Sequence, residues 1–228
     1  AGDASVNGRA WAGGGWGLRP VDIQAAERFQ RAGVGVEVLA DVESEWLTLA
    51  GWKSVRVVDE DLERRVGETV QQLEATGEEH RLLWVAVSGP AESDEGDWPE
   101  NIERIDAALA GFDRCVAAAV DGLERAGLSA EALLVVTGGR GAWLGDRGFE
   151  DDGRPMLHEE RLRTPLLLRG PGIEAGQRRL ELVQVIDLLP TLLAWFDVRA
   201  DDELLGINLL ELLEHGGGGG HEEIVMRD

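Results

Sequence analysis

The segment Leu133-Leu134-Val135-Val136-Thr137-Gly138-Gly139-Arg140-Gly141 decides the fold that the sequence predicts. It begins with four apolar residues, and such a run bounded by glycines is typical of a buried strand in a parallel sheet. The glycines that follow allow backbone conformations that other residues resist. Because ligands of open α/β sheets bind beyond the carboxyl ends of the strands, we expect the functional centre at residues 137–141.

The side chains expected at this centre favour an anion over a metal ion. Arginine can hold an anion, whereas arginine and glycine provide no carboxylate, imidazole or thiolate to ligate a cation. The sequence therefore predicts a hydrolase-like scaffold from which the catalytic chemistry is missing.

Strand and helix patterns alternate along the chain, and this alternation predicts an α/β domain. Leu82–Val87 is almost continuously apolar, which predicts a central strand covered on both faces. Pro190 lies in an apolar helical pattern, so that helix is either kinked or begins near Asp187. We expect helices at 20–32, about 61–76, about 102–126 and about 187–196, and strands at 34–39, 54–58, 82–87, 133–136 and 165–168, with residues 42–50 ambiguous.

Three regions follow from these patterns. Residues 1–19 are rich in glycine and contain Trp11 and Trp16, so we expect an irregular arm. Residues 20–213 are expected to form one α/β domain, with a largely parallel sheet and helices on both faces. Residues 214–228 contain five consecutive glycines, Gly216–Gly220, and are expected to form a flexible linker and a tail.

Composition narrows the classes of partner. The 228 residues include 44 acidic and 22 basic side chains, giving a formal net charge of −22, which repels nucleic acid and anionic membrane surfaces. No apolar run approaches the roughly 20 residues that a membrane helix needs. Cys115 is the one cysteine, so an intrachain disulfide is excluded. We expect a soluble protein without nucleic-acid or membrane partners, and no leader sequence indicates its compartment.

Four stretches in order resemble the sulfatase family of the alkaline phosphatase superfamily. The long helix with Ile105-Asp106 and Phe112-Asp113 is similar to the helix before that family's metal-binding strand. Residues 133–148 are similar to a strand followed by Thr-Ser-Asp-His-Gly and Leu-Gly-Glu-His-Gly. The others are Pro165-Leu166-Leu167-Leu168-Arg169-Gly170-Pro171-Gly172, and Asp187-Leu188-Leu189-Pro190-Thr191 followed by Gly206-Ile207-Asn208-Leu209.

The resemblance implies a sulfatase fold, but the residues depart from the family's metal site. The family's Asp-His pair, which binds calcium or another divalent metal, corresponds to Gly139 and Arg140, and a later histidine corresponds to Arg147. A guanidinium has no lone pair to donate to a cation. The family's Asp-Asp pair and its Cys or Ser nucleophile have no counterpart. We therefore expect no cofactor, no catalytic residue and no activity of this chain alone.

Anion binding without turnover is the function that remains for these positions. Arg140, Arg147 and Arg154 follow the strand, and with Thr137 and His158 they are the candidates for holding a small sulfated or phosphorylated ligand. The alternative is that the arginines pair with Asp146, Asp151 and Asp152 on a solvated loop.

A second interpretation places this chain in a larger assembly. A sheet that lacks the family's first strand would expose unpaired edges. In that case another chain would supply the strand, the metal ligands and the nucleophile, with residues 1–19 as the joint.

Overall fold

The computed structural model describes residues 20–41, 55–58, 61–73, 80–89, 98–139, 141, 159–199, 204–214 and 219–224. The predicted arm at residues 1–19 and the ambiguous segment 42–50 lie outside the described residues. Most of the polar excursion between residues 149 and 163 also lies outside them.

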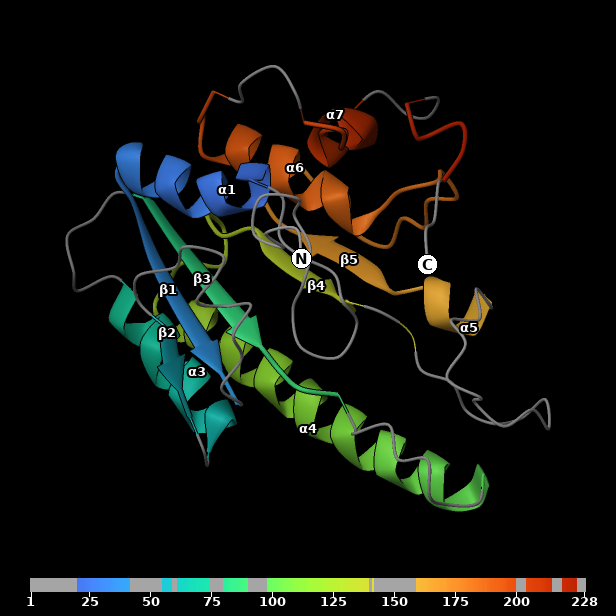
Figure 1. The fold of residues 1–228 in the computed structure, drawn as a ribbon. Helices are drawn as coiled ribbons and strands as arrows, with labels where there is room; N and C mark the ends of the chain where they lie inside the picture. The colour runs from blue at the N-terminus through green and yellow to red at the C-terminus, as the bar shows by residue number, and fades with distance from the viewer. Residues whose placement is uncertain are drawn as a thin grey trace, which may run out of the picture.

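A parallel three-stranded sheet forms the first half of the fold. Its strands are β1 (Val34–Ala40), β2 (Val55–Val57) and β3 (His80–Ala86), in the order β2-β1-β3 (Figure 1). Val38 in β1 lies opposite Val55 on one side and Trp84 on the other. Each strand corresponds to one of the predicted strands, with ends that differ by one or two residues.

A second sheet contains β4 (Leu134–Thr137) and β5 (Leu166–Arg169), which pair antiparallel. Val136 lies opposite Leu167 in this pair. Three of the five described strands are therefore parallel to one another, and β5 reverses direction. The predicted α/β architecture is confirmed.

Helices cover both faces of the first sheet, as predicted (Figure 1). On one face, Phe29 of α1 (Pro20–Arg31) and Leu193 of α6 (Leu188–Trp195) pack with Val34. On the other face, Val66 and Val70 of α3 (Leu62–Gln72) pack with Leu39, against partly buried residues of α4 (Trp98–Arg125). Burial of these apolar side chains is the main source of stability in such a layered fold.

The ends of the helices follow local sequence signals. Gly33 and Gly127, at φ +79° and +71°, follow α1 and α4 and adopt the left-handed conformation that commonly ends a helix. Asp61 occupies the N-cap position of α3, but its side chain makes no capping hydrogen bond. The Asp61 backbone adopts a left-handed conformation (φ 59°), and its carboxylate lies 3.6 Å from the Arg64 guanidinium instead.

The later helices are short. Pro190 is the third residue of α6, and a 3₁₀ turn at Val185–Asp187 precedes that helix, so the interpretation that it begins near Asp187 is correct. α5 (Glu159–Leu162) has four residues, and α7 (Leu209–Glu214) has six.

One packing expectation was wrong. β3 is the last strand of its sheet within the described residues, and the side chains from Arg81 to Ala86 are half-buried rather than central. The apolar side chains of α4 are also incompletely buried: Leu109 is 58% exposed. Both results follow from the absence of a neighbouring described element beside those residues.

The described helices include none that is both long enough and apolar enough to span a bilayer.

Candidate functional site

The carboxyl ends of β1 and β3 are joined by a carboxylate. Asp41 follows β1 and Ser88 follows β3. The Ser88 backbone N–H donates to Oδ1 and Oδ2 of Asp41 at 2.9 and 2.8 Å, and its hydroxyl donates to Oδ2 at 2.7 Å. Ser88 thus donates to both oxygens of this carboxylate, which fixes the strand ends. The sequence placed both residues after strands, but it contained no signal that they would meet.

The end of β4 is tied to the start of β5. The Thr137 hydroxyl donates to the Pro165 carbonyl oxygen at 3.0 Å, and the Gly138 N–H approaches the same oxygen at 3.3 Å. A Cβ at Gly138 would lie 3.5 Å from side-chain atoms of Thr164 and Pro165. The Thr137 hydroxyl therefore already has a structural hydrogen bond, and it could only accept, not donate, while this bond lasts.

Gly139 has different surroundings. It is exposed, and a Cβ at this position would meet no atom of the described residues within 4 Å. The described part of the chain thus leaves space beside the backbone at the end of β4. The other predicted anion-binding residues, Arg140, Arg147, Arg154 and His158, lie outside the described residues, as do their alternative partners Asp146, Asp151 and Asp152. Their assembly into one site stays a prediction.

The residues at the end of β4 do not fit a divalent metal ion. Gly139 has no side chain to donate a lone pair, and the residue type at position 140 is a permanent cation. Throughout the part of the chain that the structure describes, no three histidine, cysteine, aspartate or glutamate side chains gather as metal ligands. We therefore derive no catalytic step through a metal.

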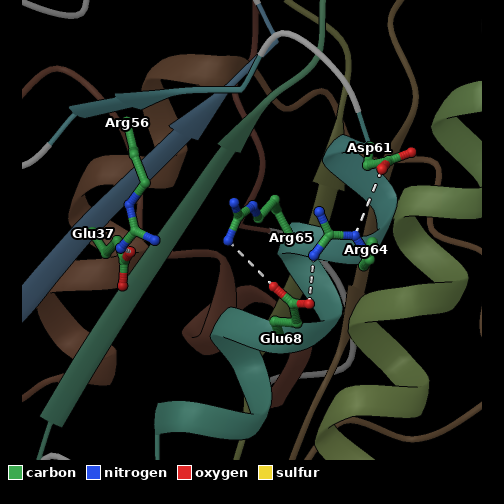
Figure 2. Close-up of polar contacts among 6 residues, drawn as sticks. All are labelled: Glu37, Arg56, Asp61, Arg64, Arg65 and Glu68. Atoms are coloured by element: carbon green, nitrogen blue, oxygen red, sulfur yellow. Dashed lines mark hydrogen bonds and ion pairs between the residues drawn. The ribbon is translucent and has the colours of Figure 1, made fainter.

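The described arginines beside β2 and α3 are neutralised by carboxylates (Figure 2). Arg56 pairs with Glu37 across β1 and β2. Arg64 pairs with Glu68 at 2.6 Å, and Arg65 approaches the same carboxylate at 3.4 Å. The hydrogen bond from Arg64 to Glu68 raises the pKa of Arg64. These pairs leave that surface without an excess of positive charge for an anion.

Cys115 is not placed as a nucleophile. It is buried in the middle of α4, and desolvation raises the pKa of its thiol, so the reactive thiolate is disfavoured. Its side chain is 7% exposed and belongs to the buried apolar core.

A buried carboxylate that sequence reasoning did not single out organises the C-terminal part. Asp187 is fully buried, and it accepts from the backbone N–H of Gln184 at 2.6 Å and of Ile207 at 2.9 Å. The His221 Nε2 atom lies 2.8 Å from the same carboxylate. One side chain thereby joins three segments of the chain, including residues 219–224 of the predicted tail.

Thr191 extends this cluster. Its buried hydroxyl donates to the Asp187 carbonyl oxygen at 2.6 Å and accepts from the Leu209 N–H at 2.9 Å. Since these polar groups satisfy one another, the cluster holds α6 to α7 and has a structural role. The Asp187-Leu-Leu-Pro-Thr191 motif was the available signal.

Comparison with known proteins identifies the family. The family model described as Sulfatase matches residues 53–198, well over half of the chain. The chain belongs to the sulfatase family.

Two curated relatives of this sulfatase-family chain match about half of it. An N-acetylglucosamine-6-O-sulfatase of Bacteroides thetaiotaomicron is 29% identical over 112 residues, which are 49% of this chain and 20% of that protein. An arylsulfatase of Chlamydomonas reinhardtii is 27% identical over 115 residues, 49% of this chain and 18% of that protein. The matched part thus spans about a fifth of each relative's length.

Solved structures support the fold. Ps i-CgsB, in complex with k-i-k-neocarrahexaose, superposes with a TM-score of 0.64 at 15% identity, covering 84% of this chain and 57% of that one. BT4656, in complex with its substrate D-glucosamine-2-N,6-O-disulfate, gives 0.58 at 14% identity, covering 85% and 64%. At these identities the likeness shows the fold, which is the sulfatase fold that the resemblance implied.

Proposed function

We propose that this chain is a sulfatase-family protein that binds a sulfate or phosphate ester without hydrolysing it. The observation that carries the proposal is the end of β4, where no described atom crowds Gly139 and Arg140 follows it, in positions that resemble the family's metal ligands. A fixed positive charge in place of a metal site favours holding an anion.

The catalytic groups that ester hydrolysis requires have no identifiable counterpart in this chain. Metal-assisted ester cleavage needs a cation to stabilise developing negative charge and a nucleophile directed at the sulfur or phosphorus atom. Of the described nucleophilic side chains considered above, Cys115 is buried within a helix, and the Ser88 hydroxyl donates to Asp41. Without both groups, a barrier reduction of many kcal/mol would have no source.

The anion would be held by guanidinium groups. Arg140 is the principal candidate because a guanidinium offers paired N–H donors that match two oxygens of a sulfate. Arg147 and Arg154 would add charge, and His158 would lie at the rim. Thr137 would donate its hydroxyl proton to the anion in exchange for its bond to Pro165. Because the whole chain carries −22, the local arginines must overcome a repulsive field.

Calorimetric titration tests this proposal. Inorganic sulfate and 4-nitrophenyl sulfate are titrated into the unmodified chain, into Arg140→Ala and into Arg64→Ala, whose guanidinium is paired with Glu68. We expect about tenfold or greater weakening for Arg140→Ala, as loss of a charge-assisted pair predicts, and no change for Arg64→Ala. Equal affinity of Arg140→Ala and the unmodified chain would overturn the proposal.

An assay of ester hydrolysis with and without added calcium tests the second half of the proposal. We expect no release of 4-nitrophenol above background in either condition. Calcium-dependent release by this chain alone would show that it has its own catalytic centre.

A second function is favoured by a separate observation. This chain aligns with 57% of Ps i-CgsB, and β3 and β4 belong to different sheets. We therefore propose as the alternative that the chain is one part of an active sulfatase, with metal ligands and nucleophile on another segment. Hydrolysis by material isolated from the native source, combined with none by this chain alone, would favour the alternative.

A further inference from the structure

A small cavity lies where α4 leads through a short turn into β4, beside the paired strand β5 (Figure 1). Its volume is about 10 Å³, which is about the space of one water-sized sphere. Four apolar side chains, one hydroxyl and one guanidinium line it, and none of these lining residues is acidic: Val120, Leu123, Ser129, Ala132, Leu134 and Arg169. The cavity is therefore sized for a single water molecule or a monatomic ion.

The pairing of β4 with β5 directs two of the lining side chains to the same face. Leu134 lies opposite Arg169 in the antiparallel pair. Their neighbours Val135 and Leu168 pack in the cluster that α6 and α7 form on the other face. Because side chains alternate along a strand, Leu134 and Arg169 project to the face on which the end of α4 lies.

The end of β5 is held close to the turn that precedes β4. A Cβ at Gly170 would lie 3.1 Å from Cδ1 of Leu133 and 3.3 Å from the Ala132 carbonyl oxygen. This close approach of the two backbones requires glycine next to Arg169, and it fixes the base of the arginine side chain beside the cavity.

The Ser129 hydroxyl is a polar group of this cavity that has no partner. Its Oγ atom is buried and makes no hydrogen bond within the part of the chain that the structure describes. Leaving a buried hydroxyl unpaired costs free energy, and buried polar groups of native proteins nearly always have a protein or solvent partner. An occupant of the cavity that accepts a hydrogen bond would remove this cost.

Arg169 adds a positive charge that no described carboxylate neutralises. By contrast, Arg125 at the end of α4 pairs with Asp121 at 3.4 Å. The apolar lining of the cavity lowers the local dielectric, so the attraction of the guanidinium for a negative charge is stronger there than in water. A hydroxyl and a guanidinium can both donate hydrogen bonds, and together they favour an anion.

We propose that this cavity binds a monatomic anion, chloride, between the Ser129 hydroxyl and the Arg169 guanidinium. Chloride accepts several hydrogen bonds at once and has a size close to that of the cavity, whereas a sulfate or phosphate group is too large for it. Arg169 is exposed, which gives the ion access from solvent. The bound ion joins the turn after α4 to the end of β5.

Two sources of negative charge oppose an anion here, and neither is concentrated at the cavity. The C-terminal end of α4 carries a partial negative charge, but the carbonyl oxygens of Gly122, Leu123 and Glu124 already accept N–H groups of residues 126–128. The net charge of −22 is spread over the chain, and salt screens it over about 10 Å at 0.1 M. The Arg169 guanidinium belongs to the lining itself.

Thermal unfolding in sodium chloride and in sodium gluconate of equal ionic strength tests the proposal. Gluconate is too large for the cavity, so only chloride can stabilise the folded chain by binding there. We expect a midpoint about 2–4 °C higher in chloride for the unmodified chain. This difference should vanish in Arg169→Gln and shrink in Ser129→Ala.

The matched control is Arg178→Gln, which removes an exposed arginine that has no described partner and does not line the cavity. It should keep the full difference between the two salts. The midpoint of each variant in gluconate shows that the variant folds, and Ser129→Ala carries the comparison if Arg169→Gln does not fold. An equal difference in the unmodified chain, Arg169→Gln and Ser129→Ala would be a general salt effect and would overturn the proposal.

Bromide locates the ion directly. In crystals of the unmodified chain grown with sodium bromide, we expect an anomalous-scattering peak between Ser129 Oγ and the Arg169 guanidinium. A water molecule at this place without anomalous signal would overturn the proposal. A bromide peak combined with no chloride-specific shift in solution would mean binding at crystal concentration only, and would overturn it as well.

The chloride site and the anion site proposed above are independent of one another. Leu134, at the start of β4, lines the cavity, whereas Gly139 and Arg140 follow the other end of that strand. We expect Arg140→Ala to retain the chloride-specific shift. Loss of sulfate affinity in Arg140→Ala without any chloride-specific shift in the unmodified chain would overturn the chloride site alone.

Discussion

At the scale of single residues, Gly206 shows how closely two backbones approach. A Cβ at this position would lie 2.3 Å from the Ile186 carbonyl oxygen and 2.9 Å from the Asp187 Cα atom. We expect Gly206→Ala to lower the free energy of unfolding by about 1–3 kcal/mol, because both neighbouring atoms belong to the backbone and must move. Thermal and denaturant unfolding would measure the change.

The matched control for this substitution is Gly139→Ala. A Cβ at Gly139 would have no atom of the described residues within 4 Å, so we expect its alanine variant to differ by less than about 0.5 kcal/mol. A similar loss for both variants would show that the cost comes from glycine's backbone freedom and not from the contact with Ile186.

The buried Asp187 carboxylate supports a second prediction at this scale. Asp187→Asn replaces one acceptor oxygen by an N–H₂ group, which cannot accept from the Gln184 or Ile207 N–H. We expect a loss of about 1–3 kcal/mol in the free energy of unfolding, as for an unsatisfied buried donor. Asp113→Asn, on an exposed part of α4, should be neutral, and equal stability of both variants would contradict the structural role of Asp187.

At the scale of secondary-structure elements, α3 and α4 pack closely because glycines lie at their contact. A Cβ at Gly122 would lie 3.0 Å from Cβ and Cγ1 of Val70, and 3.3 Å from the Gly67 carbonyl oxygen. We expect Gly122→Leu to force the helices apart and to destabilise the protein by about 1–3 kcal/mol. Urea unfolding followed by far-ultraviolet circular dichroism would measure the loss.

For Gly111, in the same helix α4, we expect substitution by alanine to raise stability. The nearest described neighbour of a Cβ there would be the flexible Arg114 side chain at 3.7 Å. Gly111→Ala should therefore raise stability by about 0.5–1 kcal/mol, since alanine restricts the unfolded chain more than glycine does. If Gly122→Leu were tolerated as well as Gly111→Ala, the close crossing of α3 and α4 would be wrong.

Local patterns predicted these elements well, because each pattern is contained in a short stretch. The helix expected at about 102–126 corresponds to α4, and the strand expected at 34–39 corresponds to β1. For the Asp187 cluster, the local motif from Asp187 to Thr191 did not reveal the partners that lie far along the chain. Ile207 and His221 lie 20 and 34 residues from Asp187, and these contacts arise only when three segments fold together. The edges of β3 likewise depend on which strand lies beside it.

The candidate anion site was likewise predicted only in part from the sequence. The sequence placed Thr137 and Gly139 at the carboxyl end of a strand, and the structure confirms that position for both. The sequence did not reveal that the Thr137 hydroxyl donates to the Pro165 carbonyl oxygen. That carbonyl belongs to the segment before β5, the strand that pairs with β4. Arg140, Arg147, Arg154 and His158 remain predictions.

At the scale of the whole molecule, a net charge of −22 predicts a response to salt. Repulsion among like charges opposes the compact state, and salt screens it over about 10 Å at 0.1 M. We expect the midpoint of thermal unfolding to rise by several degrees between about 10 mM and 500 mM sodium chloride. A calorimetric salt series would test this, and a falling midpoint would mean that the surface ion pairs outweigh the repulsion.

The first sheet has unlike borders, and this difference affects how copies can aggregate. β2 is three residues long, and its central residue, Arg56, is held by Glu37 of β1. A short border strand with a charged residue is a poor template for adding further strands, so fibrous growth is disfavoured from that side. Within the described residues the opposite border is β3, and another strand can add to the sheet there. Two copies of the sheet could therefore pair once, through β3, but further copies could not add in a repeating way.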